Sequence, residues 1–124
     1  MAPPIPTTAE LVILQNLWTA GPASVREIHR RLGQSIGYTG MLKLLQIMLA
    51  KGLVARDESG RAHVYSAAKT REDVQDQMLA DLASRVFAGS QVRLALRALS
   101  SEAISPAELQ SIRALLDRAD GPER

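Results

Sequence analysis

The chain has 124 residues, of which 46% are hydrophobic and 3% aromatic, and it contains no cysteine. This composition predicts one domain, or a small domain with an extension, around an aliphatic core. It excludes disulfides, thiolate catalysis and thiolate metal sites, and no apolar run reaches the roughly 18 residues of a membrane span. We expect a cytoplasmic protein without a secretory signal and without a cofactor or bound metal.

The net charge of +2 is unevenly distributed along the chain. Residues 1–69 contain eight Lys or Arg and four Asp or Glu, whereas residues 70–124 contain seven and nine. The basic first part is therefore a candidate for contact with a polyanion. Ordinary scatter of surface charge is the alternative explanation, so the asymmetry alone decides little.

The first part of the chain predicts three helices, over residues 8–19, 25–32 and 38–51. The first two follow Thr7 and Ser24, each with a glutamate three residues later. This spacing is the capping box, in which a hydroxyl and a carboxylate satisfy free backbone amides. Gly52 is expected to cap the C-terminus of the third helix.

A hairpin is predicted directly after the third helix, because the hydrophobic period changes there from about 3.6 to about 2 residues. Residues 53–67, LVARDESGRAHVYSA, predict two strands joined by a turn at Ser59-Gly60. Three helices and a hairpin indicate a mostly α winged helix-turn-helix domain, expected to cover residues 1–69. In that fold the third helix enters the major groove and the hairpin lies along the DNA backbone.

Residues 70–124 predict a helical region whose three amphipathic helices cover about 70–87, 91–99 and 106–119. These helices need a surface to pack on, and we expect a second copy of the chain to provide it. Packing against the winged domain of the same chain is the alternative. The apolar residues expected at the dimer interface are Met78, Leu82, Val86, Leu96, Leu99, Leu109, Ile112 and Leu116.

The third helix is expected to have one apolar face and one polar face. On the polar face a lysine can neutralise a phosphate or donate to guanine, a glutamine can bridge adenine, and a threonine can do either. The DNA-binding candidates in this helix are Tyr38, Thr39, Gly40, Lys43 and Gln46. A ridge that simply faces solvent is the alternative interpretation.

Further DNA contacts are expected from the hairpin and from the start of the second helix. Arg61 and His63 follow the hairpin turn and suit contacts with phosphates. Ser24 and Arg26 stand at a helix N-terminus, where backbone amides favour anions. Ile47 lies on the polar side of the third helix, where it either contacts a thymine methyl group or packs on the hairpin.

Several segments together resemble the penicillinase-repressor family of the BlaI, MecI and CopY type. They are GPASVREIHRRL, YTGMLKLLQIMLAKGLVARDESGRAHVYSA, and FAGSQVRLAL followed by ISPAELQSIRALL. The similarity covers about residues 6–119, and Lys51 to Val54 with Gly60 to Tyr65 is its most specific part. The resemblance implies a homodimeric winged-helix repressor that binds a palindromic operator and dimerises through its C-terminal helices.

The chain departs from the family pattern at positions that bear on specificity and induction. Gly40 and Lys43 stand where a threonine is typical, and Ile47 stands where an arginine is typical, so we expect a different operator. The Asn-Phe bond that is cleaved in resistance members aligns near Arg97 and is not preserved here. The cysteine pairs of copper-responsive members are absent, and a sensor or small-molecule inducer is left open.

Two other classes of function compete with DNA binding. A winged-helix module that binds a protein partner would use the same exposed ridge, and Ile47 and Gly40 favour it slightly. An enzyme is disfavoured, because His29 and His63 are the only histidines and no hydrolase, metalloprotease or phosphate-loop motif is present.

Overall fold

The computed structural model describes residues 5–33, 36–101 and 103–120. The chain divides into two compact units, Met1–Met78 and Leu79–Arg124. The division falls within the helix α4 (Arg71–Val86), whose first two turns belong to the first unit. It therefore lies later in the chain than residue 69, where the sequence places the end of the winged domain.

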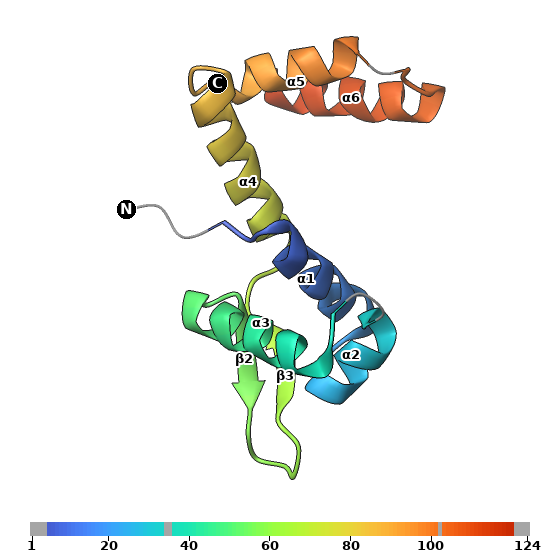
Figure 1. Ribbon diagram of the computed structural model, residues 1–124. Helices are drawn as coiled ribbons and strands as arrows, with labels where there is room; N and C mark the ends of the chain where they lie inside the picture. The colour runs from blue at the N-terminus through green and yellow to red at the C-terminus, as the bar shows by residue number, and fades with distance from the viewer. Residues whose placement is uncertain (1–4, 34–35, 102, 121–124) are drawn as a thin grey trace. The chain divides into compact units, whose positions relative to one another are not determined.

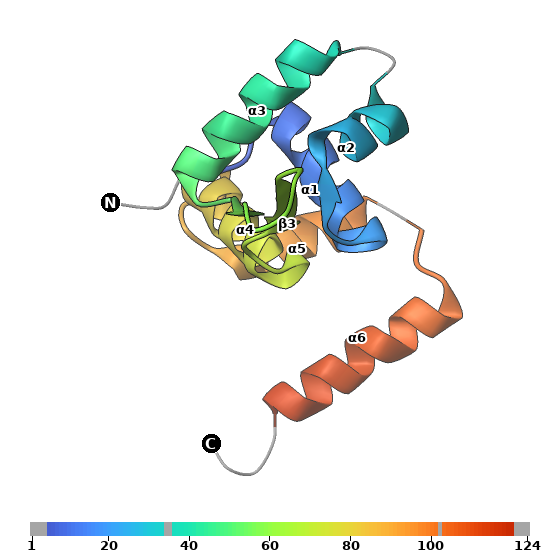
Figure 2. The same cartoon turned by 90° about the horizontal axis from the view of Figure 1, so that it is seen from below.

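The first unit has the element order of a winged helix-turn-helix domain. Its elements before α4 are α1 (Thr8–Ala20), β1 (Ala23–Ser24), α2 (Val25–Leu32), α3 (Tyr38–Lys51), β2 (Val54–Asp57) and β3 (Val64–Ala67). In the views of Figures 1 and 2, α3 lies on the outside of this unit, with α1 and α2 beside it. The mostly α fold class predicted from the sequence is confirmed.

Local capping explains where the helices begin. The Thr7 hydroxyl accepts from the Glu10 N–H at 3.2 Å, and the Glu10 carboxylate accepts from the Thr7 N–H at 2.9 Å. Ser24 and Glu27 repeat this exchange at the start of α2, with the same two distances. At the C-terminal end of α3, Gly52 adopts φ 79°, the left-handed conformation that glycine reaches without strain.

The hairpin belongs to a three-stranded antiparallel sheet in the order β1-β3-β2. In β1, Ala23 pairs with Tyr65 and Ser24 with Val64. The sequence did not predict β1, because two residues are too short to give an alternating pattern. Between β2 and β3 the ladder ends at the pair Asp57 and Val64, so residues 58–63 form a longer tip than the predicted two-residue turn.

One hydrophobic core holds the first unit together, with contributions from all of its elements up to β3. Its buried members are Ile13, Leu14, Leu17, Ala23, Val25, Ile28, Met41, Leu45, Met48, Leu53, Val54 and Tyr65. Trp18 packs on this core and donates its indole N–H to the Lys69 carbonyl at 2.9 Å. The Arg71 guanidinium lies 5.6 Å from the centre of the Trp18 ring, so the first turn of α4 is attached to α1.

The second unit contains the rest of α4 and two further helices, α5 (Gln91–Ser100) and α6 (Pro106–Ala119). Ala88 and Gly89, with φ of 53° and 85°, separate α4 from α5 at the predicted break. Ser90 and Ser105 cap α5 and α6 through their hydroxyls. Among the described residues, no helix has both the length and the apolar character needed to cross a membrane.

Candidate nucleic-acid interface

The exposed face of α3 carries the side chains that the sequence proposed for base contacts. Met41, Leu45 and Met48 are buried in the core, which turns the opposite side of the helix outward. The DNA-binding candidates on the outward side are Tyr38, Thr39, Gly40, Lys43 and Gln46, all exposed. Ile47 lies on the same side and is 41% exposed. The polar ridge predicted from the sequence is therefore exposed on the surface of the domain.

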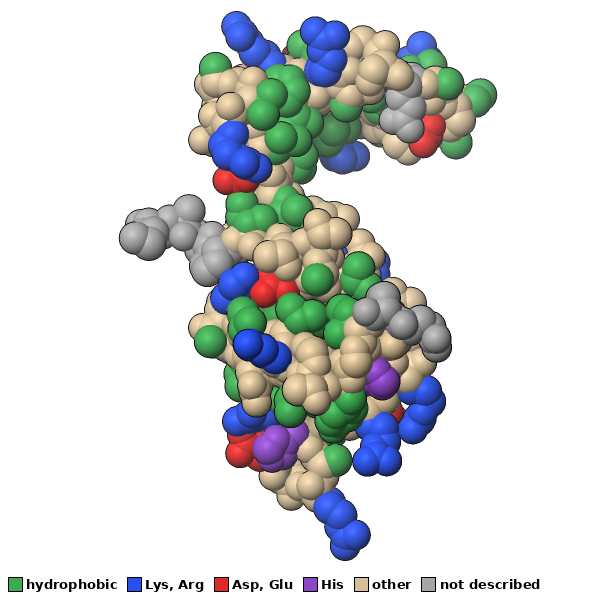
Figure 3. Space-filling model, viewed as in Figure 1, with side chains coloured by type: hydrophobic (Ala, Val, Ile, Leu, Met, Phe, Trp, Pro, Cys, Tyr) green, Lys and Arg blue, Asp and Glu red, His purple; other side chains and the backbone are tan. Residues whose placement is uncertain are grey.

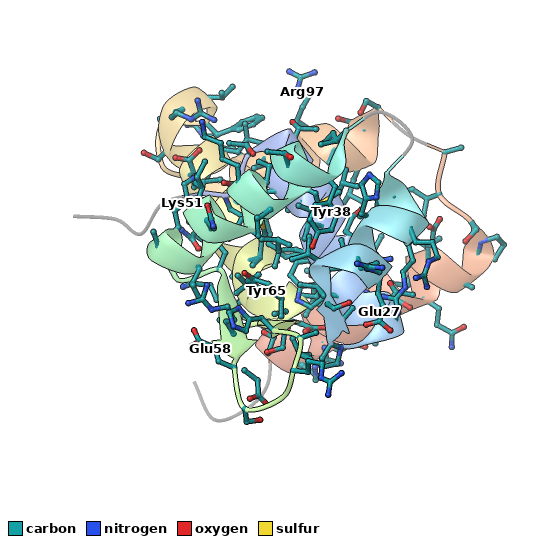
Figure 4. The ribbon with its side chains drawn as sticks, turned by 60° about the horizontal axis from the view of Figure 1, so that its bottom comes forward. Glu27, Tyr38, Lys51, Glu58, Tyr65 and Arg97 are labelled. Carbon is teal, nitrogen blue, oxygen red and sulfur yellow. The ribbon has the colours of Figure 1, made fainter. Side chains whose placement is uncertain are left out.

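A groove of about 370 Å³ lies where α2, α3 and the hairpin meet. We call it the wing groove. Its lining residues are Ser24, Val25, Arg26, Tyr38, Leu42, Arg61, Ala62, His63 and Tyr65. Figure 4 shows Tyr38 and Tyr65 on this side of the domain. Five residues chosen from sequence for DNA binding thus line one groove, and its described lining contains no carboxylate.

Strand β1 explains why the start of α2 lies beside the hairpin. Ser24 pairs with Val64 of β3 and is also the N-cap of α2. The hydrogen bond from the Ser24 backbone N–H lowers the pKa of the Glu27 carboxyl, with smaller contributions from Arg31 and Arg30. The capping box therefore occupies the amides of Ser24 and Glu27, and the exposed Arg26 side chain is the cation at this end of α2.

The wing, residues 54–67, carries both basic and acidic groups. Arg56 donates to Glu58 through Nε at 2.7 Å, and hydrogen bonds to Tyr65 and Glu58 raise the pKa of its guanidinium. The Asp57 carboxylate accepts from the Ser59 N–H at 2.9 Å, which lowers the Asp57 pKa. These contacts order the approach to the tip.

Arg61 and His63 differ from Arg56 in that both are exposed at the wing tip. Neither takes part in an ion pair with another of the described residues. Figure 3 shows Lys and Arg side chains in blue around the wing and α2. Arg61 is therefore the cation best placed on the wing to meet an external phosphate.

His29 has a role that the sequence did not reveal. Its Nε2 lies 3.1 Å from the Ile36 carbonyl oxygen, and its ring meets the Tyr38 ring edge-on, with centroids 5.9 Å apart. The histidine thus links α2 to the N-terminus of α3, which carries the candidate base contacts. His29 is half-buried.

The C-terminal end of α3 is held by a second contact that the sequence did not reveal. Lys51 Nζ lies 3.0 Å from both carboxylate oxygens of Glu10, whose residue is 1% exposed. Burial alone would raise the pKa of Glu10, but the Thr7 N–H and Lys51 outweigh it and lower that pKa. The exposed face of α3 is therefore fixed at both ends of the helix.

The apolar residues predicted for dimerisation are largely uncovered within the chain. Leu82, Val86, Leu96, Leu99, Leu109 and Leu116 are each exposed by 37% or more, whereas Met78 and Ile112 are half-buried. Neither α5 nor α6 has a buried residue. The exposed apolar side chains of α4, α5 and α6 are therefore numerous, whereas a typical protein surface carries such side chains singly.

These features define the class: the domain is a winged helix-turn-helix with a basic groove beside its third helix. Residues 6–118 match the family described as "Penicillinase repressor", and the chain belongs to this family. The family resemblance inferred from the sequence is confirmed. The family is one of transcriptional repressors and not of enzymes, and the expectation of a non-enzymatic protein is confirmed with it.

Among curated proteins, the chain is similar to "Transcriptional regulator BlaI" of two Mycobacterium tuberculosis strains, CDC 1551 / Oshkosh and ATCC 25618 / H37Rv. Identity is 28% over an alignment of 75 residues, and the match covers 58% of this chain. The match spans 54% of the relative, so about half of each curated protein is covered.

Three solved structures are also similar to the chain. The solution structure of apo-NmtR is 26% identical over 64% of this chain and 65% of that one, with a TM-score of 0.47. M. tuberculosis Rv0081 is 24% identical over 77% and 81%, with a TM-score of 0.48. The regulator Tm0710 of Thermotoga maritima is 20% identical over 91% and 78%, with a TM-score of 0.48.

Proposed function

We propose that the chain is a homodimeric transcriptional repressor that binds a palindromic operator through α3 and the wing. The observation that carries the proposal is the wing groove, in which Arg26, Tyr38 and Arg61 converge beside the exposed face of α3. A helix of this kind fits the major groove, where Lys43 and Gln46 would meet base edges. Arg61, with His63, would then contact the phosphate backbone.

The proposal of a homodimer is supported by the exposed apolar side chains of α4, α5 and α6. Val86, Leu96 and Leu116 are 60% or more exposed within one chain. A second copy would cover such a surface through a symmetric interface, and the two copies of α3 would then reach successive turns of the duplex. Half-sites about 34–36 Å apart are expected from this geometry.

The test for DNA binding is selection of bound sequences from random duplexes, followed by fluorescence anisotropy on the selected site. Lys43→Ala should reduce the discrimination between selected and random DNA by about 1–3 kcal/mol. Arg61→Ala should weaken binding to all sequences alike and reduce the slope of log affinity against log salt by about one. A selection that yields no preferred sequence would contradict the proposal.

The test for the dimer is sedimentation of the full chain and of two variants with an added charge in α5. Leu96→Glu should shift the protein toward the monomer, because it places a carboxylate in the proposed apolar interface. Gln91→Glu adds the same charge to the exposed first turn of the same helix and should leave the dimer intact. A wild-type chain that sediments as a monomer at micromolar concentration would refute this part of the proposal.

The competing proposal, a winged-helix module for a protein partner, predicts a different response to salt. Binding to DNA through phosphates releases counterions, so its affinity should fall steeply between about 50 and 200 mM salt. Absence of DNA binding at the lower concentration would favour the protein partner.

A further inference from the structure

Ile47 is an exposed apolar side chain on a face that is otherwise polar. It is 41% exposed and is not among the half-buried hydrophobic residues that pack on the core of the first unit. Packing against the wing, one of the two roles considered from the sequence, would have covered it. A side chain left uncovered in this way keeps its apolar surface available to a ligand.

The neighbours of Ile47 on α3 are groups suited to the major groove. Lys43 lies one turn before it, and Gln46 adjoins it on the exposed side. Gly40 lies two turns before Ile47 on nearly the same line of the helix, because seven residues are close to two turns. Gly40 has no side chain, and the Ile36 side chain lies against it, 3.0 Å from where a Cβ would stand.

We infer that Ile47 reads the C5-methyl group of a thymine, and that it gives the protein a preference for thymine at one position of each half-site. The inference rests on the proposed function. Thymine is the only base that presents a methyl group in the major groove, where apolar side chains contact it. The polar neighbours Lys43 and Gln46 would read hydrogen-bonding groups on adjacent bases, and Ile47 would supply an apolar contact beside them.

DNA fits this side chain better than an apolar protein surface does. Of the large hydrophobic residues described as exposed in the first unit, only Tyr38 and Ile47 belong to α3. Tyr38 stands at the N-terminus and contacts His29, so Ile47 is the one large apolar residue described as exposed on the later turns of α3. A protein partner would require a contiguous apolar patch, whereas a single methyl group requires one side chain.

The experiment replaces each thymine of the selected site, one at a time, with deoxyuridine, which lacks only the methyl group. Affinities are measured for the wild type, Ile47→Ala and, as a matched control, Gln46→Ala. Loss of one buried methyl contact should weaken wild-type binding about fourfold at one thymine per half-site. Ile47→Ala should bind thymine and deoxyuridine at that position equally, whereas Gln46→Ala should keep the difference.

Folding does not confound this test, because Ile47 and Gln46 are both exposed and their truncation opens no cavity. Two results would overturn the inference while leaving DNA binding intact. One is specific binding that no deoxyuridine substitution weakens. The other is a methyl preference that persists unchanged in Ile47→Ala. A selection that yields no preferred sequence would instead overturn both the inference and the proposed function.

Discussion

Removal of the Lys51 ammonium group should destabilise the winged domain, because it leaves the buried Glu10 carboxylate, 41 residues away in the sequence, without its cation. The Glu10 carboxylate is almost fully buried and accepts from Lys51 at 3.0 Å through both oxygens. Breaking a fully buried ion pair by removing one partner costs about 3–5 kcal/mol. Because the Lys51 side chain is 27% exposed, water replaces part of the lost contact, and we expect Lys51→Met to cost about 2 kcal/mol.

Glu10→Gln provides the matched comparison. A glutamine keeps an oxygen that accepts from the Thr7 N–H, as in the Gln form of the capping box, and leaves Lys51 able to turn toward water. We expect a loss of about 1 kcal/mol. The double variant should lose less than the sum of the two single variants, since the carboxylate that Lys51→Met leaves unpaired is then absent.

Urea denaturation at several pH values measures these free energies and tests the role of charge. The pKa of Glu10 is lowered from 4.5 in the folded chain, so the stability that the ionised group contributes is present above pH 4.5 and is lost as the pH falls through the lower, folded value. In Lys51→Met, burial is no longer offset by the lysine, and the Glu10 pKa rises. The deficit of this variant should therefore be largest near pH 7 and shrink in acid. A Lys51→Met protein as stable as the wild type at pH 7, or losses that add, would refute the reasoning.

Three further substitutions test local features of the first unit. Gly52→Ala should cost about 1 kcal/mol in urea denaturation, because φ is 79° and no atom lies within 4 Å of the added methyl group, so only backbone strain contributes. Glu58→Gln should remove the ion pair of Arg56 but leave its hydrogen bond to Tyr65, and it should steepen the salt dependence of DNA affinity in anisotropy titrations by up to about one unit; an unchanged slope would show that Arg56 makes no phosphate contact. His29→Phe keeps a ring beside α3 but loses the bond to the Ile36 carbonyl, and its thermal unfolding should show a loss of about 1 kcal/mol.

The helices of this chain could be predicted closely because their ends are encoded locally. The hydroxyl and carboxylate of each capping box lie three residues apart, so Ser24 fixes the start of α2 without help from the rest of the fold. The αL conformation at Gly52 fixes the end of α3 in the same way. Periodicity then separates the buried face of α3 from the face that carries Lys43 and Gln46.

The features that escaped prediction depend on partners distant in the sequence. The sequence around Glu10 indicates a capping residue, and nothing near it in the chain indicates an ion pair with Lys51. The residues around His29 form no sequence pattern that indicates its contact with Tyr38. Strand β1 exists only because Ala23 and Ser24 pair with residues of β3 that lie at least 40 residues later. The wing groove likewise required the fold, because its residues come from α2, α3 and the hairpin, which are separated in the sequence.

The register of the small sheet leaves the residues of the wing tip outside the strand pairs that hold the domain together. Asp57 and Val64 form the last pair of the hairpin, and Ser24 pairs with Val64 from the other side. Residues 58–63 lie beyond these pairs and contribute none of the core side chains. We therefore expect the domain to accept segments of other length or charge between Asp57 and Val64 with its core unchanged, so that the proposed affinity for the phosphate backbone could be varied at the wing tip alone.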